Sequence, residues 1–149
     1  MPATTRWESG LRFVTTHPKG STITTDMPVQ LGGGGREPSP GWFFRAGLAS
    51  CAATTIAMEA AAQGIELTTL EVAAHSRSDS RGFLGVPDEL GSPVFAGPHE
   101  VSLHVRIAAA GASPDTLRQM VERSQERSPI PSAVRSAVPV VLKVDVVPA

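Results

Sequence analysis

The chain has 149 residues, of which 41% are apolar and 18% are charged, and its formal net charge at pH 7 is −1. This length and composition predict a single globular domain over residues 1–149 and exclude an intrinsically disordered chain. The small net charge gives no electrostatic reason to expect a nucleic acid or an anionic membrane as a partner.

The sequence favours a cytoplasmic protein. The first residues, "MPATTRWESGLRF", lack the apolar core of a signal peptide. Arg45 and Glu59 interrupt the longest apolar run before it reaches the ~20 residues that span a bilayer. The chain has one cysteine, which excludes an intrachain disulfide and suits a reducing compartment. The spacing of Cys and His residues predicts neither a metal site nor a cofactor.

The first forty residues are predicted to form strands and turns. Residues 11–17 and 21–26 are rich in β-branched side chains, and "HPKG" between them supplies a turn. The segment "QLGGGGREPSP" (30–40) follows, and four consecutive glycines do not favour a regular element. We expect either a mobile loop here or a loop that brings its backbone close to another group.

A long helix is predicted to follow this loop. Ser39 is a suitable N-cap, Pro40 fits the first helical position, and Gly64 suits the left-handed residue just past the end. Apolar side chains lie almost all round the helix, which predicts that protein encloses it on most sides.

The second half of the chain is predicted to hold strands and shorter helices. Residues 67–79 and 99–109 alternate between apolar and polar side chains, as in strands with one wet face. Residues 79–98 are a Gly- and Pro-rich connection, and Ser113 caps a helix. A short helix (128–137) and a closing strand (138–147) complete the order β-β-α-β-β-α-α-β. Strands clustered ahead of the long helix favour the α+β class over a parallel βαβ sheet.

Three blocks of the sequence resemble the OsmC/Ohr family, the osmotically inducible and organic hydroperoxide resistance proteins. They are "STITTDMPVQLGGGGREPSPGWFFRAGLASC", "LTTLEVAAHSRSDSRGFLG" and "ERSPIPSAVRSAVPVVLKV". The matching features are an Asp before the glycine loop, Pro-Ser-Pro at the start of the long helix, Cys51 eleven residues after Pro40, an Arg-Gly pair, and a Ser-Pro pair near the last helix. The blocks occur in family order over about residues 17–147.

The resemblance implies an OsmC-like fold and an intertwined homodimer, with the two long helices between sheets built from both chains. It also implies active sites at the dimer interface, where a reactive Cys attacks an organic peroxide and a second Cys resolves the product. Cys51 matches the reactive position. Ser128 stands where the second cysteine would be, and Gly41 and Trp42 stand where the family has a Glu that orients an Arg.

The chemistry of Cys51 requires a nearby positive charge. Peroxide reduction needs the thiolate, and an apolar helix disfavours that charged form. Arg81 is our first choice as the cation, from either chain, because a loop Arg-Gly pair is free to place a guanidinium against a helix. Arg36, His17 and Lys19 are the alternatives. Arg45 points to a different face of the helix from Cys51, although it can face a partner chain.

The sequence leaves two functions open. In the first, the protein is a one-cysteine peroxidase: Cys51 becomes a sulfenic acid, an alcohol is released, and an external thiol restores the thiol. Trp42, Phe44 and Leu48 would then form an apolar wall that selects organic hydroperoxides, and the Ser128 hydroxyl would hydrogen-bond the sulfur. In the second, the protein is a non-catalytic binder that holds an apolar small molecule at the dimer interface, and Cys51 only packs.

Overall fold

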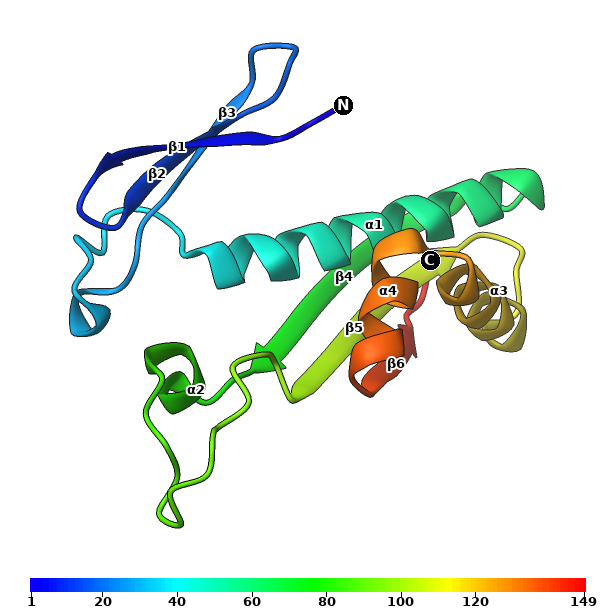
Figure 1. Ribbon diagram of the computed structural model, residues 1–149. Helices are drawn as coiled ribbons and strands as arrows, with labels where there is room; N and C mark the ends of the chain where they lie inside the picture. The colour runs from blue at the N-terminus through cyan, green and yellow to red at the C-terminus, as the bar shows by residue number, and fades with distance from the viewer. The chain divides into compact units, whose positions relative to one another are not determined.

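The computed structural model describes all 149 residues and divides into two compact units, residues 1–44 and residues 45–149. Each unit contains one three-stranded sheet. Helix α1 (Pro40–Ala62) begins in the first unit and continues in the second (Figure 1). The mixture of two sheets and four helices confirms the predicted α+β class.

The first unit is an antiparallel meander with almost no core of its own. It consists of β1 (Thr4–Ser9), β2 (Arg12–Thr16) and β3 (Thr22–Thr25), in the sheet order β1-β2-β3. The sequence prediction missed β1, because "TTRWES" has no apolar alternation. Every β1 residue is exposed, and the only buried residues of this unit are Thr25 and Asp26.

The glycine loop is folded around Asp26. A short 3-10 helix, η1 (Val29–Leu31), precedes it, and Gly32 ends this helix at φ 82°. The Asp26 carboxylate accepts hydrogen bonds from the backbone N–H groups of Met27, at 2.7 Å, and of Gly34, at 3.0 Å. A Cβ atom on Gly33 would lie 1.9 Å from the Met27 carbonyl oxygen. The second of our two alternatives is therefore confirmed, since this loop needs glycine for close backbone approach.

The second unit is built on a mixed sheet with the order β4-β5-β6. Strand β4 (Leu67–Arg77) pairs antiparallel with β5 (Glu100–Ala109), and β5 pairs parallel with β6 (Val140–Val146). The parallel pair is joined through α3 (Pro114–Glu126) and α4 (Pro129–Ala137), the long crossover that parallel strands require. The predicted connection after β4 also contains a five-residue helix, α2 (Ser80–Leu84).

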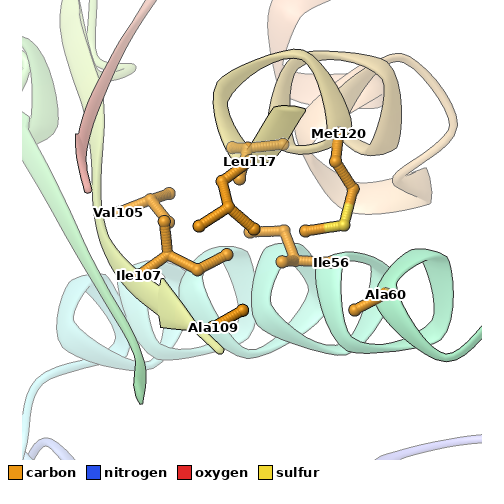
Figure 2. Packing of buried hydrophobic residues seen from close by; sticks show 8 residues of the cluster. Ile56, Ala60, Val105, Ile107, Ala109, Leu117 and Met120 are labelled. Carbon is orange, nitrogen blue, oxygen red and sulfur yellow. The ribbon is translucent and has the colours of Figure 1, made fainter. Parts of the chain in front are cut away.

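The core of the second unit lies between the sheet, α1 and α3. The inward residues of β5 match the predicted alternation, and Val105 and Ile107 are fully buried. Figure 2 shows them facing the side chains of α1 and α3; the cluster is completed by Ile56, Ala60, Ala109, Leu117, Met120 and Val121. Ser113 caps α3 as predicted, accepting a hydrogen bond from the Thr116 N–H.

Helix α1 begins and ends where the sequence predicts. The Ser39 Oγ accepts the Trp42 N–H at 3.3 Å. At the other end Gly64 has φ 66°, and the Ile65 N–H donates to the Ala60 carbonyl oxygen at 2.9 Å, a Schellman motif. None of the helices combines the length and the apolar character needed to cross a membrane.

Only one face of α1 is enclosed by the chain itself. The fully buried residues recur every fourth position: Leu48, Ala52, Ile56 and Ala60. On other faces Ala57, Met58 and Ala61 are exposed, and the Met58 side chain is 67% exposed. The expectation that protein encloses the helix on most sides is not met within one chain, because the sheet and α3 cover a single stripe.

Candidate functional site

Cys51 lies in a group of three polar side chains within the second unit. Its Sγ is 3.4 Å from the Oγ of Ser128, and the Ser128 Oγ is 3.1 Å from the Oγ1 of Thr55. Thr55 Oγ1 also donates to the Cys51 carbonyl oxygen at 2.9 Å. Cys51 and Thr55 are partly buried, whereas Ser128 is completely buried. The contact that we expected between Ser128 and the sulfur is therefore present.

Local structure explains why these residues meet. Cys51 and Thr55 are four positions apart on α1, so they share one face of the helix. Ser128 is the N-cap residue of α4, yet its side chain makes no capping hydrogen bond. Pro129 and Pro131 occupy the first and third helical positions and have no N–H to offer. The Ser128 hydroxyl is thus free to turn toward the thiol.

Gln125 of α3 contacts α1 at Ala52, the residue after Cys51, and was not among the predicted site residues. It is 1% exposed, and its Nε2 lies 3.2 Å from the Ser124 Oγ and 3.5 Å from the Ala52 carbonyl oxygen. Its Oε1 is buried without a hydrogen-bond partner. The available signal was a polar residue that continues the apolar stripe of Leu117 and Val121 by a further four positions.

Arg81 does not contact Cys51 within the chain. Its Nε and Nη2 donate to the Asp79 carboxylate, with the Nη2 to Oδ2 distance at 2.6 Å, and Asp79 also caps α2. The hydrogen bonds from the Arg81 side chain and backbone lower the pKa of Asp79 to about 2. The same hydrogen bond with Asp79 raises the pKa of Arg81. The guanidinium charge is therefore largely matched by Asp79 in an isolated chain.

The three residues predicted to form an apolar wall have different environments. Trp42 is 48% exposed and packs edge-to-face on Phe43, with ring centroids 5.0 Å apart. Phe44 is partly buried. Leu48 is fully buried in a core cluster with Val101, Leu103 and other residues, so one chain leaves it no surface for a ligand.

The arginine of α1, Arg45, is directed away from the thiol. The Arg45 Nη1 lies 3.4 Å from the Ser76 Oγ of β4, which agrees with the different helix face inferred from the sequence. No group of three or more His, Cys, Asp or Glu side chains is arranged to hold a metal ion. The candidate site is thus a thiol with two hydroxyl neighbours and no cation from its own chain in hydrogen-bond contact.

Solved structures share this fold at low sequence identity. An organic hydroperoxide resistance protein, OsmC, from Legionella pneumophila is 21% identical, with a TM-score of 0.70 and 97% of each chain covered. An OsmC-like protein from Mycoplasma pneumoniae is 18% identical, with a TM-score of 0.76 over 98% of this chain and 94% of that one.

A third structure has a small molecule bound. It is an organic hydroperoxide resistance protein from Vibrio cholerae with captopril in one of its active sites. That protein is 21% identical, with a TM-score of 0.73 over 97% of this chain and 91% of its own. A search of curated proteins found no match.

Family membership follows from a sequence model and not from these distant structures. The family model described as OsmC-like protein matches residues 32–143. The match includes the glycine loop, Cys51, the Arg81-Gly82 pair and the Ser128-Pro129 pair. The chain therefore belongs to the OsmC-like protein family.

Proposed function

We propose that this protein is a one-cysteine thiol peroxidase that reduces organic hydroperoxides through Cys51. The observation that carries the proposal is the 3.4 Å contact between the only thiol of the chain and a completely buried hydroxyl. A cysteine that only packs in a core needs no polar partner, whereas a reacting thiolate is stabilised by one. The Legionella and Vibrio structures, both named as organic hydroperoxide resistance proteins, support the substrate class.

The reaction balances without a metal or a cofactor. The Cys51 thiolate attacks the distal oxygen of the hydroperoxide, the O–O bond breaks, and the alkoxide leaves and takes a proton to become an alcohol. Sulfur is oxidised to the sulfenic acid and the peroxide is reduced. Two molecules of an external thiol, or one protein dithiol, then reduce the sulfenic acid, giving water, a disulfide and the regenerated Cys51 thiol. Ser128 has no sulfur and does not take part in this reduction.

We propose that the active form is a homodimer. The first unit buries only Thr25 and Asp26, and apolar side chains of the meander and the following loop, those of Trp7, Ile23 and Val29, are exposed. The second unit exposes Met58 on α1. A sheet without a core is unstable alone, so we expect another protein surface to bury the apolar side chains of the first unit and the exposed face of α1. A second copy of the chain supplies cover for both at once, and an obligate interface of this kind buries about 2,000 Å² or more.

In a dimer, Arg81 of one chain can lie near Cys51 of the other. A hydroxyl donor stabilises a thiolate but does not neutralise its charge, so a cation still favours ionisation. Within one chain Arg81 binds Asp79 and not Cys51. We therefore propose Arg81 of the second chain as the cation, and Trp42 and Phe44 as apolar contacts for the organic part of the substrate.

A non-catalytic binder is the second candidate, and one observation favours it. Within the chain the Cys51 Sγ has Ser128 as its hydrogen-bond partner and no basic side chain in such contact. The Vibrio protein shows that this fold holds a small molecule. In this reading an apolar small molecule occupies the dimer interface and the thiol stays neutral.

Consumption of cumene hydroperoxide in the presence of a small thiol separates the two candidates. The peroxidase proposal expects turnover by the wild-type protein and loss of all enzymatic turnover in Cys51→Ser. It also expects the thiol to react with a labelling reagent at neutral pH before denaturation. A wild-type protein that ignores the hydroperoxide, and whose thiol labels only after denaturation, is a binder.

A further inference from the structure

We propose that Ser128 and Thr55 form a hydroxyl pair that stabilises the ionised Cys51 sulfur. In this pair Ser128 donates to the sulfur, and Thr55 is a positioning residue that acts through Ser128. The inference deepens the proposed function and rests on it for the chemical use of the thiolate. The hydrogen-bond geometry itself does not depend on the substrate.

The three groups form a closed chain of contacts. The Cys51 Sγ lies 3.4 Å from the Ser128 Oγ, which lies 3.1 Å from the Thr55 Oγ1, and this oxygen is 2.9 Å from the Cys51 carbonyl oxygen. The chain therefore begins and ends on the same residue. A hydroxyl has one hydrogen to donate and two lone pairs to accept, so the direction of each bond can be worked out.

The neutral thiol fits one arrangement of hydrogens. Thr55 donates to the Cys51 carbonyl oxygen, and the thiol S–H donates weakly to the Ser128 Oγ. No heavy atom has to move from its observed position.

The thiolate fits a second arrangement of the same atoms. After the thiol proton has left to water, the Ser128 hydrogen rotates onto the negatively charged sulfur. Its oxygen is then free to accept from Thr55, which faces both Ser128 and the carbonyl oxygen. Only hydroxyl hydrogens rotate, so little reorganisation accompanies ionisation.

The burial and position of Ser128 make this role specific. Ser128 is 0% exposed, so bulk water does not reach its hydroxyl in the chain. Serine at an N-cap position usually bonds to its own helix, and this one does not. The sulfur also lies beside the first turn of α4, where the positive end of the helix dipole favours an anion. The buried hydroxyl and the helix dipole both stabilise the charged form of the sulfur.

The test compares four single variants with the wild-type protein. Ser128→Ala and Thr55→Val each remove one hydroxyl, and Thr55→Ser restores the hydroxyl at position 55. Thr54→Val is the matched control, because Thr54 makes the same type of bond to a carbonyl four residues earlier, that of Ser50, without touching Ser128. Thermal unfolding confirms that each variant folds, and Ser128→Ala deletes only one buried oxygen.

The readouts are thiolate absorbance near 240 nm against pH and the rate of alkylation by iodoacetamide at pH 7. A hydrogen bond to a charged group is worth roughly a tenfold change in an ionisation equilibrium. We expect Ser128→Ala to move the thiolate titration up by about one pH unit and to slow alkylation about tenfold. Thr55→Val should act in the same direction by about threefold, while Thr55→Ser and Thr54→Val keep the wild-type values.

Two results would overturn the hydroxyl pair. One is a Ser128→Ala titration that coincides with the wild type, and the other is an equal loss of alkylation rate in Thr54→Val and Thr55→Val. Hydroperoxide turnover by the wild type alongside an unshifted Ser128→Ala titration rejects the pair and keeps the peroxidase. If the Ser128→Ala titration is shifted but the wild-type protein does not reduce the hydroperoxide, the hydroxyl pair is supported and the peroxidase function is rejected.

Discussion

The Sγ of Cys51 and the Oγ of Ser128 lie 3.4 Å apart although 77 residues separate them in the chain. One residue is on the long helix and the other begins α4. A second sulfur at position 128 would therefore be close enough to the first to react with it. Ser128 therefore lies where a second thiol would have to lie for two-cysteine chemistry.

Ser128→Cys should convert the site to two-cysteine chemistry. After one equivalent of cumene hydroperoxide, the Cys51 sulfenic acid should condense with the introduced thiol, releasing water and forming an intrachain disulfide. Free thiols titrated under denaturing conditions should fall from two per chain to about zero, whereas the wild type should give a sulfenic acid that dimedone traps.

Ser124→Cys is the matched control for this experiment. Ser124 is equally buried, but its hydroxyl donates to the Val121 carbonyl oxygen and makes no hydrogen bond with Cys51. The two thiols of the Ser124→Cys variant should form a disulfide more slowly than those of Ser128→Cys. Equal disulfide yields from the two variants would mean that proximity in the folded chain does not control the reaction.

Arg81→Met should slow the oxidation of Cys51 by an organic hydroperoxide about tenfold, if the second chain delivers this cation. The control is Arg77→Met, since Arg77 is also paired with a carboxylate, that of Glu100, and is more exposed. Stopped-flow measurement of the oxidation rate compares the two. An Arg81→Met rate equal to that of Arg77→Met would remove Arg81 from the site.

Met58→Glu should weaken self-association. Sedimentation of the wild type at micromolar concentration should give twice the 15.6 kDa mass of one chain. Met58 is 67% exposed on α1, and burying a new carboxylate against an apolar partner surface is unfavourable. Gln119→Glu adds the same charge on the exposed face of α3 and should leave the dimer intact. A stable folded wild-type monomer would contradict the proposed assembly.

Asp26→Asn should destabilise the glycine loop in a pH-dependent way. Burial raises the pKa of Asp26, but backbone hydrogen bonds from Gly34, Met27 and Arg36 outweigh it and leave the pKa below its usual value. A lowered pKa means that the folded protein favours the charged carboxylate. The stabilisation is complete above the ordinary Asp pKa, near 4, and is lost as the pH falls through the lower folded value.

Thermal unfolding of wild type and Asp26→Asn between pH 3 and pH 7 measures this effect. The difference in midpoint should be largest at pH 5 to 7 and shrink as the solution is acidified below about pH 4. The first unit should respond most, so hydrogen exchange of the Gly34 amide is the local readout. A midpoint difference that does not change with pH would show that the Asp26 charge is not involved.

Elements whose signals are local can be predicted from the sequence alone. Ser39, Pro40 and Gly64 defined the two ends of α1, because caps depend on side chains within a few residues. The alternation of Val101, Leu103 and Val105 with polar residues defined β5 and its buried face. Strand β1 carries no such alternation, and it is a strand because it pairs with β2.

Tertiary structure decided everything that depends on distant contacts. The resemblance identified Cys51 and Ser128, but the contact of Thr55 with Ser128 forms only because α1 packs beside α4. The pairing of Arg81 with Asp79 is, by contrast, a local contact between residues two positions apart. Four glycines predicted either a mobile loop or a close backbone approach. The buried Asp26 carboxylate favours the close approach, because its charge requires the backbone N–H groups that the loop brings to it.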